Sequence, residues 1–281
     1  MLGRLFKYDM KSTASILAPV SALAILVAML ATVSLKVVIK LNNNQMATAL
    51  NISMITIFAL SMLSLIAYLI ICWIVQLYRF YKGLYTDEGY LIFTLPVKCW
   101  QILLSKLLSA VLWMIICCGV LLLCAFVIIT FGSGNDAVNI EWISGISKIF
   151  NSLDSLKVNP FRAIVTGLLS FLISSVCGFS IFFLSITVGA IISKKHKILA
   201  AIGTYYGINL VLSVIQALLS TMAGTAAVTK SAAFEGAEEP AAILLSAVSE
   251  ANIMGLIVNI TVAVLAFFIC NYLMKNKLNL A

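Results

Sequence analysis

Residues 79–106, RFYKGLYTDEGYLIFTLPVKCWQILLSK, are the longest polar interruption between apolar runs that can lie on the basic side of a membrane. Thr86 is suited to cap a helix, because its hydroxyl can accept a hydrogen bond from a free backbone N–H. Asp87 and Glu88 follow in the first turn, where the helix dipole favours negative charge. Pro96 disfavours helical geometry in the residue before it and ends the helix after about two turns. The segment therefore predicts a short capped helix with an acidic end and an aromatic body, which is suited to docking on another protein.

The residues just before this helix have their own helical pattern. Phe80 and Leu84 are four residues apart, and Arg79 and Lys82 are three apart, so each pair can share one face of a helix. This spacing predicts a short amphipathic helix over residues 78–85 that lies at the lipid headgroups. For residues 79–106 as a whole, the residues alone are equally consistent with docking on another protein and with an ordinary solvated loop between two membrane spans.

The elements that position this segment are apolar helices. The chain has 281 residues, of which 63% are hydrophobic and only 10% are charged, and its mean hydropathy is +1.13. Soluble domains are about half apolar and about a quarter charged, so this composition excludes a soluble protein. We expect an all-α integral membrane protein in which residues 1–281 form a single transmembrane domain. The expected spans are residues 14–39, 52–77, 107–131, 163–192, 198–222 and 253–274.

The distribution of charge predicts the orientation of these spans. With both termini in the cytoplasm, the inner segments hold 12 of the 18 basic residues and three of the ten acidic ones. The positive-inside rule favours this arrangement, with both termini cytoplasmic and residues 79–106 on the inner side. The net charge of +8 is thereby explained without a nucleic-acid partner.

Shorter amphipathic or apolar segments predict helices at the membrane surfaces. Residues 1–13 alternate basic with apolar side chains and predict an N-terminal interfacial helix. Residues 142–153 have apolar side chains at helical spacing and predict a surface helix in an outer loop. The apolar run at residues 241–248 is too short to span a bilayer and predicts a re-entrant or surface helix before the last span.

Several kinds of chemistry lack their sequence signals. No GxxxxGK[ST] motif occurs, so the chain has no phosphate loop and is not expected to be an ATPase enzyme by itself. No HExxH motif occurs, the seven cysteines have no disulfide or zinc pattern, and the single His196 has no metal ligands at suitable spacing, so no metal site is expected. The spans also lack the ionisable residues that ion-coupled carriers usually place at mid-membrane.

Neutral polar residues inside the spans leave two interpretations open. Hydrogen bonding between helices is the more common use of such side chains in a membrane. A lining for translocation is the sharper hypothesis, and its candidate residues are Asn209, Gln216 and Asn259.

The stretches RFYKGLYTDEGYLIFTLP and LLSKLLSA, together with the opening MLGRLFKYDMKST, resemble permease subunits of bacterial ATP-binding-cassette (ABC) exporters of the type-2 class. In that family the first cytoplasmic loop holds a coupling helix that lies in a groove of a separate ATPase subunit. The resemblance implies docking through Arg79, Lys82, Thr86, Asp87, Glu88, Gly89, Tyr90, Phe93 and Pro96.

The resemblance also implies the function and the partners. The chain would be the membrane-spanning subunit of an ATP-driven exporter in the bacterial cell membrane. It would pair with a second permease copy or a paralogue and with two cytoplasmic ATPase subunits, and ATP and Mg would bind only to those subunits, so no cofactor is expected in this chain. An amphipathic or hydrophobic substrate, such as a peptide, drug or lipid, would move outward. A non-transporting scaffold or sensor subunit and a passive channel remain as alternatives.

Overall fold

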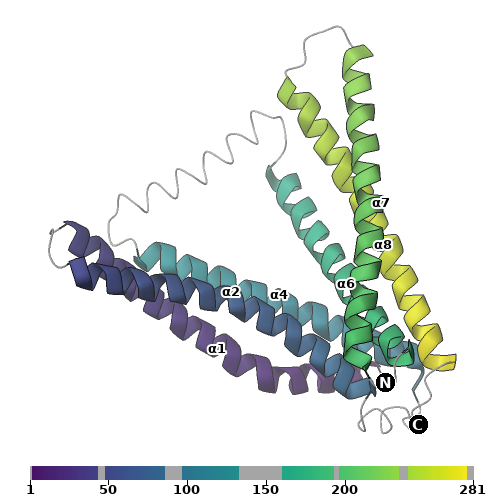
Figure 1. The fold of residues 1–281 in the computed structure, drawn as a ribbon, viewed down its shortest axis with the longest axis horizontal. Helices are drawn as coiled ribbons and strands as arrows, with labels where there is room; N and C mark the ends of the chain where they lie inside the picture. The colour runs from purple at the N-terminus through teal and green to yellow at the C-terminus, as the bar shows by residue number, and fades with distance from the viewer. Residues whose placement is uncertain are drawn as a thin grey trace. The chain divides into compact units, whose positions relative to one another are not determined.

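The computed structural model describes residues 2–43, 48–85, 97–132, 160–192, 196–233 and 240–276, and it is helical through almost all of them (Figure 1). The gaps in the helix labels follow Figure 1. The helices are α1 (Leu2–Asn43), α2 (Thr48–Tyr85), α4 (Cys99–Gly132), α6 (Pro160–Ile192), α7 (Lys197–Ala233) and α8 (Pro240–Asn276).

All six helices are long and apolar enough to cross a membrane. A bilayer core about 30 Å thick is crossed by about 20 helical residues, and even α6, the shortest helix, has 33. Large apolar side chains cover the outside of the molecule, among them Leu23, Leu122 and Phe126, each more than 60% exposed. Water would not tolerate so continuous an apolar surface, whereas lipid acyl chains would. The prediction of an all-helical protein with six apolar helices long enough to cross a membrane is therefore confirmed.

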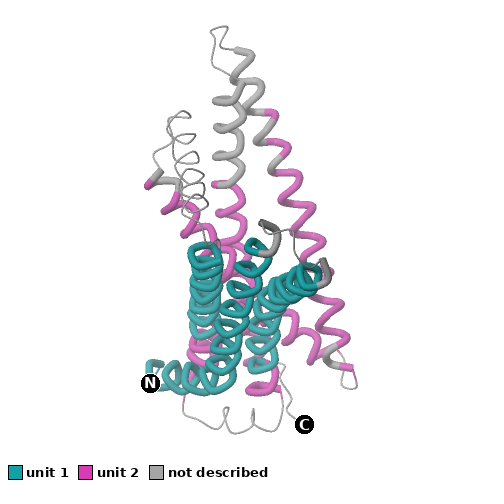
Figure 2. Tube along the Cα trace, turned by 90° about the vertical axis from the view of Figure 1, so that its left-hand side faces the viewer, with its two compact units in different colours: residues 1–80, 108–149 teal, residues 81–107, 150–281 magenta. Residues whose placement is uncertain are grey.

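The chain divides into two compact units, shown in Figure 2. Unit 1 comprises residues 1–80 and 108–149, and unit 2 comprises residues 81–107 and 150–281. Both boundaries within the described residues fall inside helices, so the last turn of α2 and the first turns of α4 belong to unit 2. The described residues on either side of 86–96, namely 81–85 and 97–106, consequently belong to unit 2.

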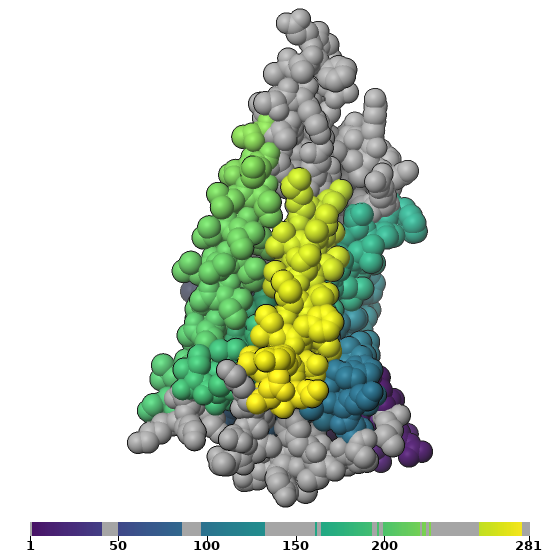
Figure 3. Space-filling view, turned by 90° about the vertical axis from the view of Figure 1, so that its right-hand side faces the viewer, coloured from purple at the N-terminus to yellow at the C-terminus, as the bar shows by residue number. Residues whose placement is uncertain are grey.

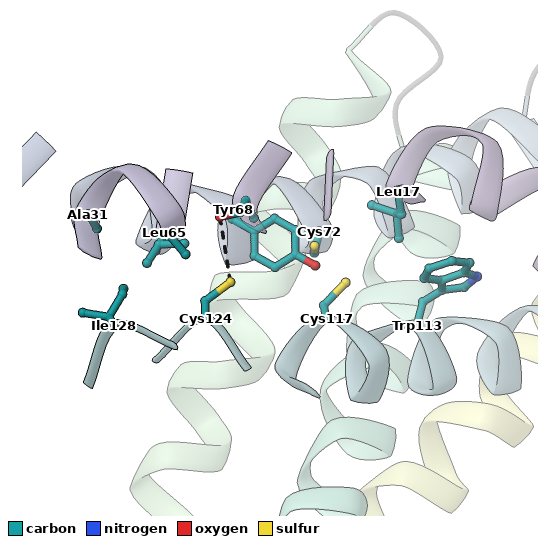
Figure 4. Packing of buried hydrophobic residues seen from close by; sticks show 11 residues of the cluster. Leu17, Ala31, Leu65, Tyr68, Cys72, Trp113, Cys117, Cys124 and Ile128 are labelled. Carbon is teal, nitrogen blue, oxygen red and sulfur yellow. Dashed lines mark hydrogen bonds between the residues drawn. The ribbon is translucent and has the colours of Figure 1, made fainter. Parts of the chain in front are cut away.

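The core of unit 1 lies between α1, α2 and α4 (Figure 4). From α1 it receives small residues, Ala24, Ala28 and Ala31, which let a neighbouring helix approach closely. The thiol of Cys124 on α4 reaches the Ala24 carbonyl at 3.8 Å. The Tyr68 ring fills the centre of the cluster, and its hydroxyl points toward the thiols of Cys72 and Cys117 (Figure 4).

The core of unit 2 is organised around α6, which packs against both α7 and α8. The end of α6 meets the start of α7 at Gly189, where an added Cβ would lie 2.5 Å from the Ala201 backbone nitrogen. Further along, the rings of Phe182 and Tyr205 stack with their centroids 4.0 Å apart. By contrast, no residue of the most apolar window of α7 is buried. Figure 3 shows α7 and α8 side by side on one face of this unit.

Three expected helices differ from the structure in where they begin or end. Residues 78–85 are the last turns of α2 and not a separate interfacial helix. Residues 2–13 are helical, but they continue into the first apolar run as part of α1. Residues 241–248 are the first turns of α8 and not a separate re-entrant or surface helix. No proline lies between residues 20 and 95 or after residue 240, so nothing interrupts the backbone hydrogen bonds at residues 77–78 of α2 or after residue 248 of α8.

Two expected helices lie outside the described residues. These are the capped helix that begins at Thr86 and the outer surface helix at residues 142–153.

Candidate functional site

The candidate site is the end of α2 and the start of α4, on either side of residues 86–96. Arg79 is half-buried, and its guanidinium donates a hydrogen bond to the Ser12 hydroxyl on α1. Lys82, one helical turn further, is exposed, as is Lys98 just before α4. At this end of α2, the Lys82 ammonium group thus lies on the surface, while one guanidinium nitrogen of Arg79 is engaged by Ser12 within unit 1.

The other predicted docking residues lie outside the described residues. They are Thr86, Asp87, Glu88, Gly89, Tyr90, Phe93 and Pro96. Their roles stay predictions from the sequence.

A buried polar contact anchors the last residue of α2. The Tyr85 hydroxyl donates a hydrogen bond to Thr187 Oγ1 on α6 at 2.6 Å. The Thr187 hydroxyl in turn donates to the Phe183 carbonyl at 2.7 Å, and the Cys270 thiol on α8 lies 3.1 Å from Thr187 Oγ1. One hydroxyl thereby connects α2, α6 and α8. We call Tyr85, Thr187 and Cys270 the Tyr85 cluster.

This cluster was not predicted from the sequence. Tyr85 lies within residues 79–106, but Thr187 is 102 residues away from it and belongs to no recognisable motif. The available signal was weak: Thr187 is a hydroxyl within an apolar span, and such residues often hydrogen-bond between helices.

The three candidate translocation residues are placed in two different ways. The Gln216 side-chain amide donates to Asn259 Oδ1 at 3.1 Å, which joins α7 to α8. The Asn209 amide donates to the Tyr205 carbonyl of its own helix at 2.9 Å. The structure therefore brings Gln216 and Asn259 together but not Asn209. The bond between Gln216 and Asn259 matches the interpretation of hydrogen bonding between helices, whereas the Asn209 bond stays within α7.

The cysteines and the histidine form no metal centre in the part of the chain that the structure describes. All seven cysteines are free thiols, and within the described ranges no group of three or more His, Cys, Asp or Glu side chains could hold a metal ion. His196 is exposed beside the start of α7, where its carbonyl accepts a hydrogen bond from the Ala200 N–H.

Comparison of the chain with protein-family models, curated proteins and solved structures finds no match.

Proposed function

We propose that this protein is the membrane-spanning subunit of an ATP-driven exporter of the type-2 ABC class. The observation that carries the proposal is the sequence of residues 79–106, with its candidate capping residue, acids, aromatics and closing proline, which runs from the last turns of α2 to the first turns of α4. The six membrane-length helices agree with this role, and an even number of crossings leaves both termini on one side.

In this proposal the energy comes from a partner. Cytoplasmic ATPase subunits bind ATP and Mg and dock on residues 79–106. Two permeases, either identical or paralogous, then shift against each other and move an amphipathic or hydrophobic substrate outward. The exposed Lys82 and Lys98, which flank the docking residues, would lie on the cytoplasmic surface, where an ATPase groove could contact them.

Co-purification tests the proposal directly. The tagged chain is co-expressed with the protein of the neighbouring reading frame, which the proposal expects to be an ABC ATPase, extracted in mild detergent and reconstituted in vesicles. We expect a stable complex that hydrolyses ATP, no hydrolysis by the lone chain, and none when the phosphate-loop lysine of the ATPase is replaced. A neighbouring frame that encodes no ATPase, or an ATPase that does not bind the chain, would contradict the proposal and favour the scaffold or channel alternative.

A further inference from the structure

The Tyr85 cluster lies at the point where residues 79–106 join unit 2. Tyr85 is the last residue of α2 and directly precedes the predicted docking residues. The side chain before it, Leu84, is fully buried, and the Tyr81 ring stacks on that of Tyr85 with centroids 6.2 Å apart. The end of α2 is therefore held firmly in unit 2, so a displacement of this end must act on the residues packed around it.

The cluster is closed to water and lipid. Thr187 is 0% exposed, Cys270 1% and Tyr85 7%. In such a low-dielectric site a hydrogen bond is stronger than in water, and a donor or acceptor left without its partner is costly. The Thr187 hydroxyl donates its only proton to the Phe183 carbonyl, and its oxygen has two lone pairs that can accept hydrogen bonds. Thr187 is therefore free to accept the Tyr85 hydrogen bond and places no competing donor against it.

The helix that receives this bond is itself tied to its neighbours. The Thr204 hydroxyl of α7 donates to the Ser185 carbonyl of α6 at 3.1 Å, two residues from Thr187. Gly189 contacts the Ala201 backbone one turn away from Ser185. The Cys270 thiol adds the contact to α8. A movement of Thr187 would consequently reach α7 and α8 as well as α6.

The geometry points to the Tyr85 cluster as the contact that transmits movement from the end of α2 to the other helices of unit 2 during the transport cycle. We call this role of the cluster the joint. Tyr85 and Thr187 are positioning residues: their hydrogen bond makes the end of α2 and helix α6 move together when the ATPase acts on residues 79–106. This inference rests on the proposed function, since it needs an ATPase that docks there. It assigns the transmission of movement, as distinct from docking, to residues outside the predicted docking set.

Matched variants separate the joint from docking and from simple stability. Tyr85→Phe and Thr187→Val remove one hydroxyl each at nearly constant volume. Thr187→Ser keeps the hydroxyl, and Tyr81→Phe removes a hydroxyl from the stacked neighbour of Tyr85. All are prepared as complexes with the neighbouring ATPase and assayed at a temperature at which each complex remains monodisperse.

The movement is followed within unit 2. Spin labels are attached to Phe161→Cys on α6 and Ile253→Cys on α8, both exposed and far along their helices from the cluster. Cys99 and Cys118, the two cysteines that are not fully buried, are first replaced by serine. The distance between the labels is measured by pulsed electron resonance without nucleotide and after trapping with ATP and vanadate.

We expect the parent complex, Thr187→Ser and Tyr81→Phe to show the same nucleotide-driven distance change. Tyr85→Phe and Thr187→Val should retain the ATPase and hydrolyse ATP within about twofold of the parent, yet lose most of the distance change. If Tyr85→Phe and Thr187→Val bind the ATPase, hydrolyse ATP and show the same distance change as the parent, the inference about the Tyr85 cluster is wrong and the proposed function is unaffected. Loss of the folded complex in both variants would reduce the cluster to a structural role and overturn the inference too. Failure of the parent to bind the ATPase would overturn the proposed function and this inference together.

Discussion

Two buried tyrosines illustrate how differently one side chain can be used in the two units. The Tyr85 hydroxyl has a short hydrogen bond to Thr187. Tyr68 is also buried, with 3% of its surface exposed, but its hydroxyl makes no hydrogen bond to any described residue. It points toward two thiols, which are weak hydrogen-bond partners (Figure 4). The same substitution should therefore have opposite consequences at these positions.

Replacing Tyr68 by Phe should leave thermal stability in detergent unchanged or raise it. An unsatisfied buried polar group costs about 1–3 kcal/mol, and Phe removes that group while keeping the ring. Tyr85→Phe is the matched comparison and should lower the unfolding temperature, because Thr187 Oγ1 loses the hydrogen bond that it accepts from Tyr85. A clear fall for Tyr68→Phe would show that its hydroxyl has a partner after all, such as a bound water.

The docking prediction also belongs to single residues. The triple variant Asp87→Lys, Glu88→Lys, Phe93→Ala should insert normally and lose its ATPase subunit. The two charge reversals remove helix-dipole terms of about 0.3–1 kcal/mol each, and Phe93→Ala removes an aromatic anchor of the kind that dominates interfaces. Pull-down and transport measurements check this outcome. Unchanged binding and transport by the triple variant would mean that residues 79–106 are only a linker.

At the scale of elements, the apolar runs of the sequence locate all six helices but not their ends. Hydropathy marks the part of a helix that lies in lipid, whereas the helix itself ends only where its backbone hydrogen bonding stops. For this reason α7 continues past the expected end at residue 222 to Ala233. The Gln216 to Asn259 bond and the Tyr85 cluster were not predictable either, because no periodicity within one helix specifies which residue of another helix it will meet.

Gly189 should be essential to the packing of α6 on α7. Alanine there would place its Cβ 2.5–2.8 Å from the backbone and Cβ atoms of Ala201, so the two helices would have to separate. Overpacking of this kind costs about 1–3 kcal/mol. Gly167 on the same helix is the control, since a Cβ at Gly167 meets nothing within 4 Å. The midpoint of thermal unfolding in detergent should be lowered by Gly189→Ala and not by Gly167→Ala; equal midpoints for the two variants would refute the close approach.

At the scale of the whole molecule, the charge distribution predicts the topology. Single-cysteine labelling in intact cells should reach positions 44, 150 and 236 from outside and positions 86 and 195 only after the membrane is opened. The physical reason is the excess of basic residues on one side of the six helices. Labelling of position 86 from outside would reverse the orientation and remove the docking segment from the cytoplasm.

Because α8 is long, a small tilt of this helix at the Tyr85 cluster would displace its far end by several ångströms. Cys270 lies 30 residues from the first residue of α8, Pro240, so about 45 Å of helix extends beyond the contact with Thr187. A stiff rod of that length, tilted by about 5° around its contact point, carries its far end through roughly 4 Å. If α8 tilts as one rigid body, a displacement at Cys270 too small to break a hydrogen bond would thus be magnified toward the opposite end of the helix, and the bond from Gln216 to Asn259 would pass part of the movement to α7.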